Sequence, residues 1–299
     1  MIENIDKWRK AGKIAAEALM FGKNIIKPGV KLIDVADAVD KKIVELGAQP
    51  AWPSQLSLND VAAHYTADPE QDTVLTDQVV SLDVGAHIDG CVGDTACTVD
   101  LSGKHEKLVD AVKDALRNAV KVVKIGVEIR EIGKVIEQTI HEYGFVPVKN
   151  LSGHGISSWV IHDSPSIPNF DNGNKAVLQK GQIIAIEPFA STGAGIVDEN
   201  ERGNIFSLIA PKPIRSVFAR DVLAHISQNY KTLPFTTRWL TRIFGSAKTN
   251  LALRELLQAG VLQPHPPLVD VNHGLVSVYE KTLLVDDVVE VLTPYDENG

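Results

Sequence analysis

Residues 81–100 read SLDVGAHIDGCVGDTACTVD, a stretch that has the pattern of a β-hairpin but carries aspartates in mid-strand positions. Its centre is Asp89-Gly90, a dipeptide that favours the φ > 0 turn of a two-residue hairpin loop. With that loop, Asp83 pairs with Ala96, two residues from Asp94. The two carboxylates then project from one face, diagonally placed with their Cα atoms about 7–8 Å apart. Charges so close repel each other unless a cation lies between them or the face is solvated.

The composition is that of an ordinary globular protein. The chain has 299 residues, of which 44% are hydrophobic and 23% charged, and its formal net charge is −8. This charge argues against nucleic acid as the main ligand. Cys91 and Cys97 form neither a CxxC pair nor a disulfide framework, which favours a reducing cytoplasm. The sequence contains no apolar run of membrane-spanning length, and residues 1–20 indicate an amphipathic helix instead of a signal peptide.

The chain also repeats itself. Residues 26–50, IKPGVKLIDVADAVDKKIVELGAQP, match residues 123–147, VKIGVEIREIGKVIEQTIHEYGFVP, at a fixed offset. The apolar positions between the matched residues keep helical spacing, so each copy predicts a helix. The matched pairs are Gly29 with Gly126, Val30 with Val127, Gly47 with Gly144, and Pro50 with Pro147.

The similarity continues downstream of each copy, where it relates the acidic residues of two strands. Asp83 corresponds to Glu187, and Asp94 corresponds to Glu280. We therefore expect two similar halves that pack about a pseudo-two-fold axis and bring the four carboxylates together at the centre. Each half also has a preceding helix-like segment (5–25 and 106–124) and a histidine (His64 and His162).

The two halves differ by an insertion at residues 193–270. It contains helical segments such as RDVLAHISQNY (220–230) and LALRELLQAG (251–260), separated by turns with proline and glycine. The sequence thus predicts one catalytic domain formed by residues 1–192 and 271–299. A small helical, winged-helix-like subdomain at 193–270 interrupts it.

Four carboxylates at one site require cations. Oxygen ligands with one imidazole suit a pair of divalent metals about 3.5–4 Å apart, and such a pair supports hydrolysis. The candidate imidazole is His154 in LSGHGIS, where the flanking glycines allow the backbone to come close. Taken singly, each residue is better explained as a solvated strand or loop residue. Their joint placement at repeat-related positions favours a metal site.

The order Asp83, Asp94, His154, Glu187 and Glu280, with its local contexts, resembles the methionine aminopeptidases. The resemblance covers essentially the whole chain, and it implies the pita-bread fold of peptidase family M24. This is an α+β fold with two pseudo-symmetric halves whose antiparallel sheets surround a central dimetal site. The insertion, with KTLPFTTRWL (231–240) and LALRELLQAGVLQPHPPL (251–268), resembles the type 2 enzyme in its compact archaeal form.

The resemblance also implies a role for each metal ligand. Asp83 holds one ion, His154 and Glu187 hold the other, and Asp94 and Glu280 bridge both. The cofactors are two divalent ions, which could be cobalt, manganese, iron or zinc.

Further roles follow from the same resemblance. A metal-bound water or hydroxide attacks the scissile carbonyl, and Glu187 also shuttles the proton. His162 contacts the carbonyl oxygen, and His64 lies near the scissile amide nitrogen. The methionine pocket is lined by Trp52, Pro234 and His265.

The implied function is removal of the initiator methionine from nascent proteins, with a preference for small second residues. We expect a monomer in the cytoplasm that associates transiently with ribosomes and has no membrane or specific nucleic-acid partner. One alternative is an Xaa-Pro peptidase of the same fold. Another is a non-catalytic relative that binds the ribosome or RNA.

Overall fold

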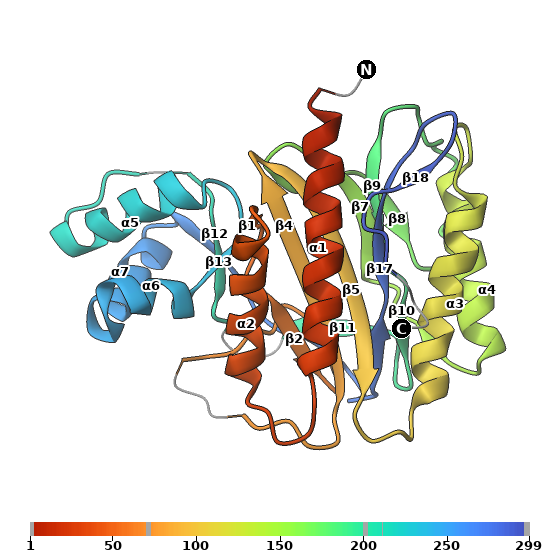
Figure 1. Cartoon of the computed structure of the whole chain (residues 1–299), viewed down its shortest axis with the longest axis horizontal. Helices are drawn as coiled ribbons and strands as arrows, with labels where there is room; N and C mark the ends of the chain where they lie inside the picture. Colours follow the sequence, from red (N-terminus) through yellow and green to blue (C-terminus); the bar gives the residue numbers. More distant parts are fainter. Residues whose placement is uncertain (1–2, 70–72, 200–202, 211, 296–299) are drawn as a thin grey trace.

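The structure, a computed structural model, describes residues 3–69, 73–199, 203–210 and 212–295 (Figure 1). The outer ends of the predicted catalytic domain, at residues 1–2 and 296–299, lie outside the described residues. Within the described ranges, no helix combines the length and the apolarity needed to cross a membrane.

The predicted hairpin is confirmed as strands β4 (Val79–Ile88) and β5 (Cys91–Asp100). Asp83 pairs with Ala96, as predicted. The turn residues Asp89 and Gly90 both have positive φ, 51° and 86°. Asp83 and Asp94 therefore lie on one face of this ribbon, because side chains alternate between faces along a strand.

One antiparallel sheet joins the two halves. Its strand order is β1-β4-β5-β17-β9-β7-β8, with β2 added beside β4 and β18 beside β17. The halves meet where β5 pairs with β17, in a register that sets Glu280 opposite Ala96. The strands not yet bounded are β1 (Gln49–Pro50), β2 (Gln55–Leu58), β7 (Ser152–Ser157), β8 (Val160–Pro168), β9 (Ile183–Ile186), β17 (Glu280–Leu284) and β18 (Glu290–Val291).

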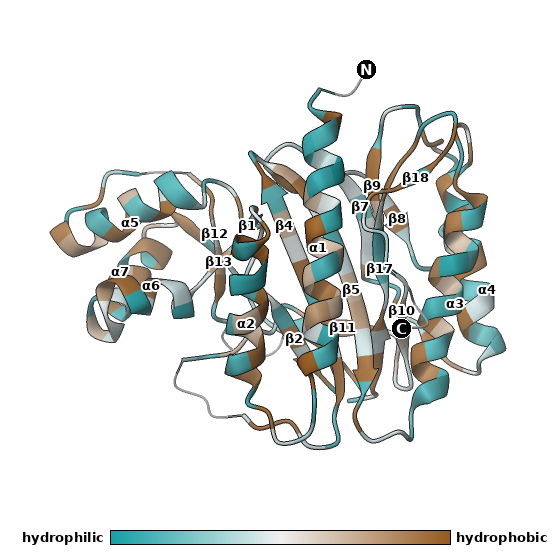
Figure 2. Ribbon diagram, in the orientation of Figure 1, coloured by the Kyte–Doolittle hydropathy of each residue, from teal (hydrophilic) through white to brown (hydrophobic). Residues whose placement is uncertain are grey.

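Two helix pairs cover one side of this sheet, α1 and α2 over the first half and α3 and α4 over the second (Figure 1). Hydrophobic and hydrophilic residues intermingle along each helix, as amphipathic helices require (Figure 2). In α3 the buried positions include Leu108, Val112, Ala115 and Ala119, which recur at helical spacing. The bounds are α1 (Ile5–Ile25), α2 (Leu32–Glu45), α3 (Glu106–Val122) and α4 (Ile129–Glu142).

The internal repeat is visible in the backbone. Gly29 and Gly126 both have positive φ, 87° and 81°, in the turns before α2 and α4. Lys31 forms a β-bridge with Val74, and the repeat-related Glu128 forms one with Val177. The two halves therefore share their turn geometry as well as their helices.

Among the described residues between β10 (Phe189–Ser191) and β16 (Val276–Val278), the chain forms three helices and a small antiparallel sheet with strand order β13-β12-β14 (Figure 1). A separate hydrophobic cluster, which includes Phe206, Val222, Phe235, Leu240 and Leu256, holds these elements together. The bounds are β11 (Val197–Glu199), β12 (Ile205–Leu208), α5 (Val217–Asn229), β13 (Phe235–Thr236), α6 (Thr237–Phe244), α7 (Ser246–Gln258), β14 (Leu262–His265) and β15 (Leu268–Asp270).

Two further three-stranded sheets complete the fold. One has the order β11-β15-β3, and the other β16-β10-β6. Through the pairing of β15 with β3 (Val61–Ala63), the end of the inserted segment is hydrogen-bonded to the first half. The remaining bounds are β6 (Val146–Pro147), β10 (Phe189–Ser191) and β16 (Val276–Val278).

Helix α1 packs on β5 at a contact between two glycines. A Cβ atom on Gly93 would lie 2.4 Å from the Cα atom of Gly12, a backbone contact that no side-chain rotation relieves. We expect Gly93→Ala to lower the free energy of unfolding by about 3 kcal/mol. The control is Gly103→Ala, which meets no atom within 4 Å but has a φ of +67°. It should cost about 1 kcal/mol. Equal losses in urea unfolding of the two variants would contradict the packing argument.

Candidate metal centre

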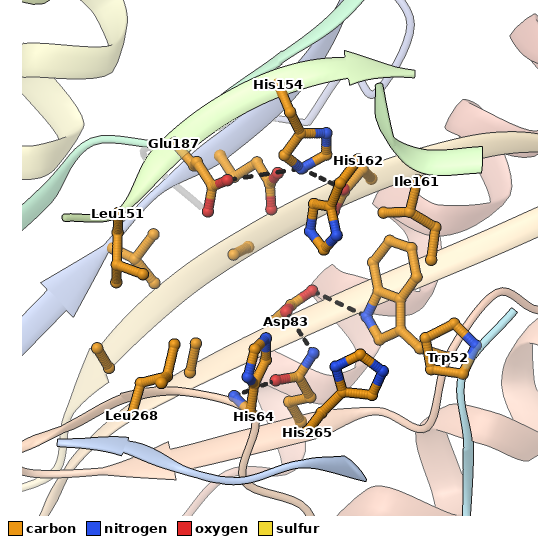
Figure 3. A pocket seen from close by; sticks show the side chains of 18 of the residues that line it. Trp52, His64, Asp83, Leu151, His154, Ile161, His162, Glu187, His265 and Leu268 are labelled. Carbon is orange, nitrogen blue, oxygen red and sulfur yellow. Dashed lines mark hydrogen bonds and ion pairs between the residues drawn. The ribbon is translucent and has the colours of Figure 1, made fainter. Parts of the chain in front are cut away.

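A cavity of about 490 Å³ opens on the side of the sheet opposite helices α1–α4. Leu82 and Val84 pack into the core beneath the helices. Asp83, between them, points into the cavity (Figure 3). Every predicted site residue lines this cavity: Trp52, His64, Asp83, Asp94, His154, His162, Glu187, Pro234, His265 and Glu280.

Its centre is a group of buried metal-binding side chains. Asp94 on β5, His154 on β7 and Glu280 on β17 each offer one ligand atom, and these atoms lie within 4.8 Å of one another. Glu187 follows β9 directly, and its Oε1 lies 3.5 Å from His154 Nε2 (Figure 3). The same Nε2 lies 3.7 Å from Asp94 Oδ2. Both halves thus supply candidate metal ligands to one point.

The strand that carries His154 fits only because glycines flank it. A Cβ on Gly153 would lie 2.3 Å from the carbonyl oxygen of Ala185 on β9, and one on Gly155 would lie 2.1 Å from that of Ser164 on β8. The close backbone approach expected from LSGHGIS is therefore confirmed.

Two buried threonines fix the strands that carry the central acids. Thr95 Oγ1 donates to the carbonyl oxygen of Glu280 at 2.9 Å. Across the same pair of strands, Thr282 Oγ1 donates to the carbonyl oxygen of Asp94 at 2.8 Å and accepts from the Asp94 N–H at 2.9 Å. These side-chain bonds add to the backbone hydrogen bonds between β5 and β17. They therefore fix the backbones of Asp94 and Glu280 relative to each other.

The four carboxyl groups are poorly suited to share this cavity as anions. Burial, followed by the charge of neighbouring carboxylates, raises the pKa of Asp94, Glu187 and Glu280 well above the ordinary value. Burial also raises the pKa of Asp83 to about 7. Like charges in a dry cavity favour protonation unless a cation neutralises them.

The hydrogen bond made by His154 leaves its Nε2 atom with a lone pair that can bind a cation. Its Nδ1 lies 3.2 Å from the carbonyl oxygen of Gly155, which can only accept, so Nδ1 carries the hydrogen. Burial lowers the pKa of His154 to about 3, so the ring is neutral and Nε2 presents a lone pair to Asp94 and Glu187. A lone pair and carboxylate oxygens facing one another form the donor set that a divalent metal requires. The residues present fit the predicted metal.

Asp83 accepts hydrogen bonds from two side chains of the first half. Trp52 Nε1 donates to Oδ1 at 3.1 Å, and Gln55 Nε2 donates to Oδ2 at 2.8 Å (Figure 3). Gln55 Oε1 in turn accepts the backbone N–H of His64 at 2.5 Å. This chain of contacts joins a carboxylate to the backbone of His64, which has a left-handed φ of 64°.

Histidine rings line the cavity around the carboxylates. The rings of His154 and His162 are 4.6 Å apart between centroids, and those of His64 and His265 are 5.6 Å apart. Burial lowers the pKa of His64 to about 4 and lowers that of His162, so both are neutral near pH 7. Their nitrogens can donate or accept hydrogen bonds without adding charge.

Some residues of the site were not predicted from the sequence. Gln55 lies directly opposite Asp83 where β2 pairs with β4, a register that the long segment between these strands, which contains β3, does not reveal. Ser207 bonds to His265 Nε2 at 2.9 Å, across the pairing of β12 with β14. Alternation along β12 could have suggested Ser207, but only after that strand had been recognised.

Comparison with known proteins gives one consistent family. The model of metallopeptidase family M24 matches residues 6–219. The methionine aminopeptidase of Archaeoglobus fulgidus is 44% identical over 94% of this chain and 95% of its own length. That of Methanothermobacter thermautotrophicus is 40% identical over 96% and 97%.

A solved structure supports the fold. The crystal structure of methionine aminopeptidase from Thermotoga maritima superposes with a TM-score of 0.73 at 24% identity, covering 99% of this chain and 98% of that one. Together with the family match, it confirms the predicted pita-bread architecture.

Metal binding should raise the thermal stability of the folded chain, because a cation removes the repulsion among the buried acids. With Mn²⁺ or Co²⁺ in about hundredfold excess over its Kd, we expect Tm to rise by roughly 5 °C. Asp94→Asn should lose most of this rise without lowering the metal-free Tm. The control Asp110→Asn, on the exposed side of α3, should keep the full rise. An equal rise in both variants, measured by calorimetry, would contradict the assignment.

Proposed function

The chain belongs to metallopeptidase family M24, and on that premise we propose that it is a methionine aminopeptidase. It is a metal-dependent hydrolase that removes the N-terminal methionine from proteins. The observation that carries this proposal is the convergence of Asp83, Asp94, His154, Glu187 and Glu280 on one cavity. Similarity at 40–44% identity over most of the chain supports the same reaction.

Two of the five proposed ligands come from the first half and three from the second, because His154 has no counterpart in the first copy of the repeat. We propose that Asp83, Asp94 and Glu280 would hold one divalent ion, and that His154, Glu187, Asp94 and Glu280 would hold the other. When bound, divalent ions supply Lewis-acid polarisation of a carbonyl and make water acidic near neutral pH. The carboxylates offset the positive charge and fix its position relative to the cleft.

We propose that three side chains act on the substrate. His64 Nδ1 lies 3.3 Å from the carbonyl oxygen of Pro266 and so carries the hydrogen, which leaves Nε2 as an acceptor for an N–H of the scissile amide. Neutral His162 retains one N–H that can donate to the carbonyl oxygen and stabilise charge developing there. Glu187 lies beside His154 in the cavity, and we propose that its carboxylate passes a proton from water to the leaving amine.

The methionine side chain is proposed to lie in the part of the cavity bounded by Trp52, His265 and Pro234. The Trp52 ring lies flat over β4, since a Cβ on Gly85 would come within 2.4 Å of it. We propose that the residue that follows methionine lies beside the central carboxylates and must be small to fit there. Small second residues are therefore preferred.

The finer identity is the type 2, archaeal-like form, supported by the long inserted segment, for which we propose a winged-helix-like fold with bounds at 193–270. We propose that its substrates are N-termini of nascent polypeptides, met in the cytoplasm by a monomer that visits the ribosome transiently. Both cysteines are free and buried, which fits a reducing compartment. The net charge of −8 fits the absence of a membrane or specific nucleic-acid partner.

Metal-stripped protein titrated with Mn²⁺, Fe²⁺, Co²⁺ or Zn²⁺ should release free methionine from Met-Ala-Ser. We expect Glu187→Ala to lower kcat/KM by about 10³-fold, because it removes both a metal ligand and a proton carrier. The control Glu142→Ala, exposed at the end of α4, should match the wild type.

Each other outcome of this assay points elsewhere. No turnover with any metal, by protein whose circular dichroism shows it folded, would favour a non-catalytic relative that binds the ribosome or RNA. Cleavage confined to Met-Pro peptides would favour an Xaa-Pro peptidase.

His64 is expected to act on the reaction and not on folding. His64→Ala should lower kcat by about 10²-fold while metal affinity stays within about twofold of the wild type. His141→Ala, exposed on α4, is the control. Unchanged kcat in His64→Ala would remove this residue from the mechanism.

A further inference from the structure

The proposed methionine pocket has walls from two parts of the chain far apart in sequence. One wall, here the first wall, carries Trp52 and Gln55 and belongs to the first half. The other, the inserted wall, carries Pro234 and His265 and belongs to the inserted segment. The width of the pocket therefore depends on how firmly the inserted segment is held against the first half.

A single carboxylate bonds to both parts. Asp40, on α2, is buried with 8% of its surface exposed and accepts four hydrogen bonds. Its Oδ1 accepts from the Ser54 N–H at 3.0 Å and from Ser54 Oγ at 2.7 Å. Its Oδ2 accepts from Arg238 Nη2 at 3.0 Å and from Trp239 Nε1 at 2.8 Å. One oxygen thus serves the first half and the other serves the inserted segment.

On the first side, the contact of Asp40 is adjacent to the wall itself. Ser54 lies between Trp52 and Gln55, the two residues that bond Asp83. The Ser54 carbonyl oxygen also accepts from Thr66 Oγ1 at 2.7 Å, so this loop is held from both sides. Fixing Ser54 fixes the backbone on which the first wall is built.

On the other side, the path to the inserted wall is a short strand ladder. Arg238 is the second residue of α6, the helix that follows β13, and Thr236 on β13 pairs with Ile205 on β12. Ile205 pairs in turn with His265 on β14. A carboxylate that holds Arg238 therefore holds, through two paired positions, the strand that carries His265.

Because Arg238 is buried, its charge must be compensated by the carboxylates that it contacts. Its exposed fraction is 0%, and its Nε atom has no hydrogen-bond partner within the described part of the chain. Asp37, whose side chain is partly exposed, forms an ion pair with Arg238 and another with Arg242. A buried guanidinium held this way depends on its carboxylates, because losing one leaves its charge partly uncompensated.

We propose that Asp40 is a positioning residue for substrate specificity, which couples the two walls of the pocket that receives the N-terminal side chain. The proposal rests on the proposed aminopeptidase function. Asp40 touches neither the metal ligands nor the cleft, so its effect acts through Ser54 on one side and Arg238 on the other. It should govern substrate affinity more than the chemical step.

The test compares Asp40→Asn with Asp37→Asn. Asp40→Asn replaces the oxygen that faces Arg238 and Trp239 by an NH₂ donor. Asp37→Asn weakens only the ion pair between Arg238 and the more exposed carboxylate of Asp37. We expect Asp40→Asn to raise KM for Met-Ala-Ser about tenfold, equivalent to ~1.4 kcal/mol, with kcat within about twofold. The inhibition constant of free methionine should rise by the same factor. Asp37→Asn should change each constant by less than about threefold.

Ser54→Ala approaches the anchor from the other side and leaves the pair with Arg238 intact, so it remains informative if Asp40→Asn does not fold. It should raise KM in the same direction by about threefold without changing kcat. A fall in kcat with unchanged KM in either variant, or equal effects of Asp37→Asn and Asp40→Asn, would overturn the proposal.

Hydrogen exchange separates this inference from the proposed function. In Asp40→Asn, amides of both walls, at 52–58 and 262–265, should exchange faster, whereas Asp37→Asn should leave the first wall unchanged. Absence of peptide cleavage by the wild type would refute the aminopeptidase function. Faster exchange in Asp40→Asn at only one of the two walls would refute the coupling, whether or not the chain is an enzyme.

Discussion

The pairing of β5 with β17 is the contact on which the rest of the structure depends. Thr95 and Glu280, bonded across it, are 185 residues apart in the chain. Without this pairing each half would present an open sheet edge, and Asp94 and Glu280 would belong to separate surfaces. Because the pairing is antiparallel and in fixed register, it brings one carboxylate from each half to the pseudo-two-fold axis. The pairing of β5 with β17 therefore completes the central sheet and also brings Asp94 and Glu280 together in the candidate metal centre.

The same strand pairing brings buried carboxylates so close that they repel one another, and a divalent metal removes this repulsion. Burial removes the water that would screen the four acids, and the neutral ring of His154 offers them a lone pair in place of a proton. A cation satisfies every one of these groups at once, since imidazole and carboxylate oxygens are both good ligands. Stability and reactivity are linked here, because the charge that relieves repulsion among the ligands also polarises a substrate.

The two repeat halves and the inserted segment contribute different things to the site. The halves supply the four carboxylates of the candidate metal centre and the neutral rings of His64, His154 and His162. The inserted segment contributes His265 and Pro234, which reach the cavity from a separately packed unit with its own hydrophobic cluster. A unit packed in this way can change pocket shape without disturbing the metal ligands. Its anchoring to α2 through buried Arg238 is then as relevant to specificity as the residues that touch substrate.

The hairpin register, the helices of the repeat and the residues that line the candidate metal centre could be predicted from the sequence. Each of these depends on local turn chemistry, such as Asp89-Gly90, or on a pattern written twice in one chain. Only the tertiary structure decided the role of Gln55, the pairing of Ser207 with His265, and the bond from Arg238 to Asp40. Arg238 and Asp40 are 198 residues apart. Asp40 lies in the first copy of the repeat and Arg238 in KTLPFTTRWL, but neither pattern indicates that the two side chains meet. Such contacts depend on how separately formed units pack, and packing leaves no periodic pattern in the sequence to read.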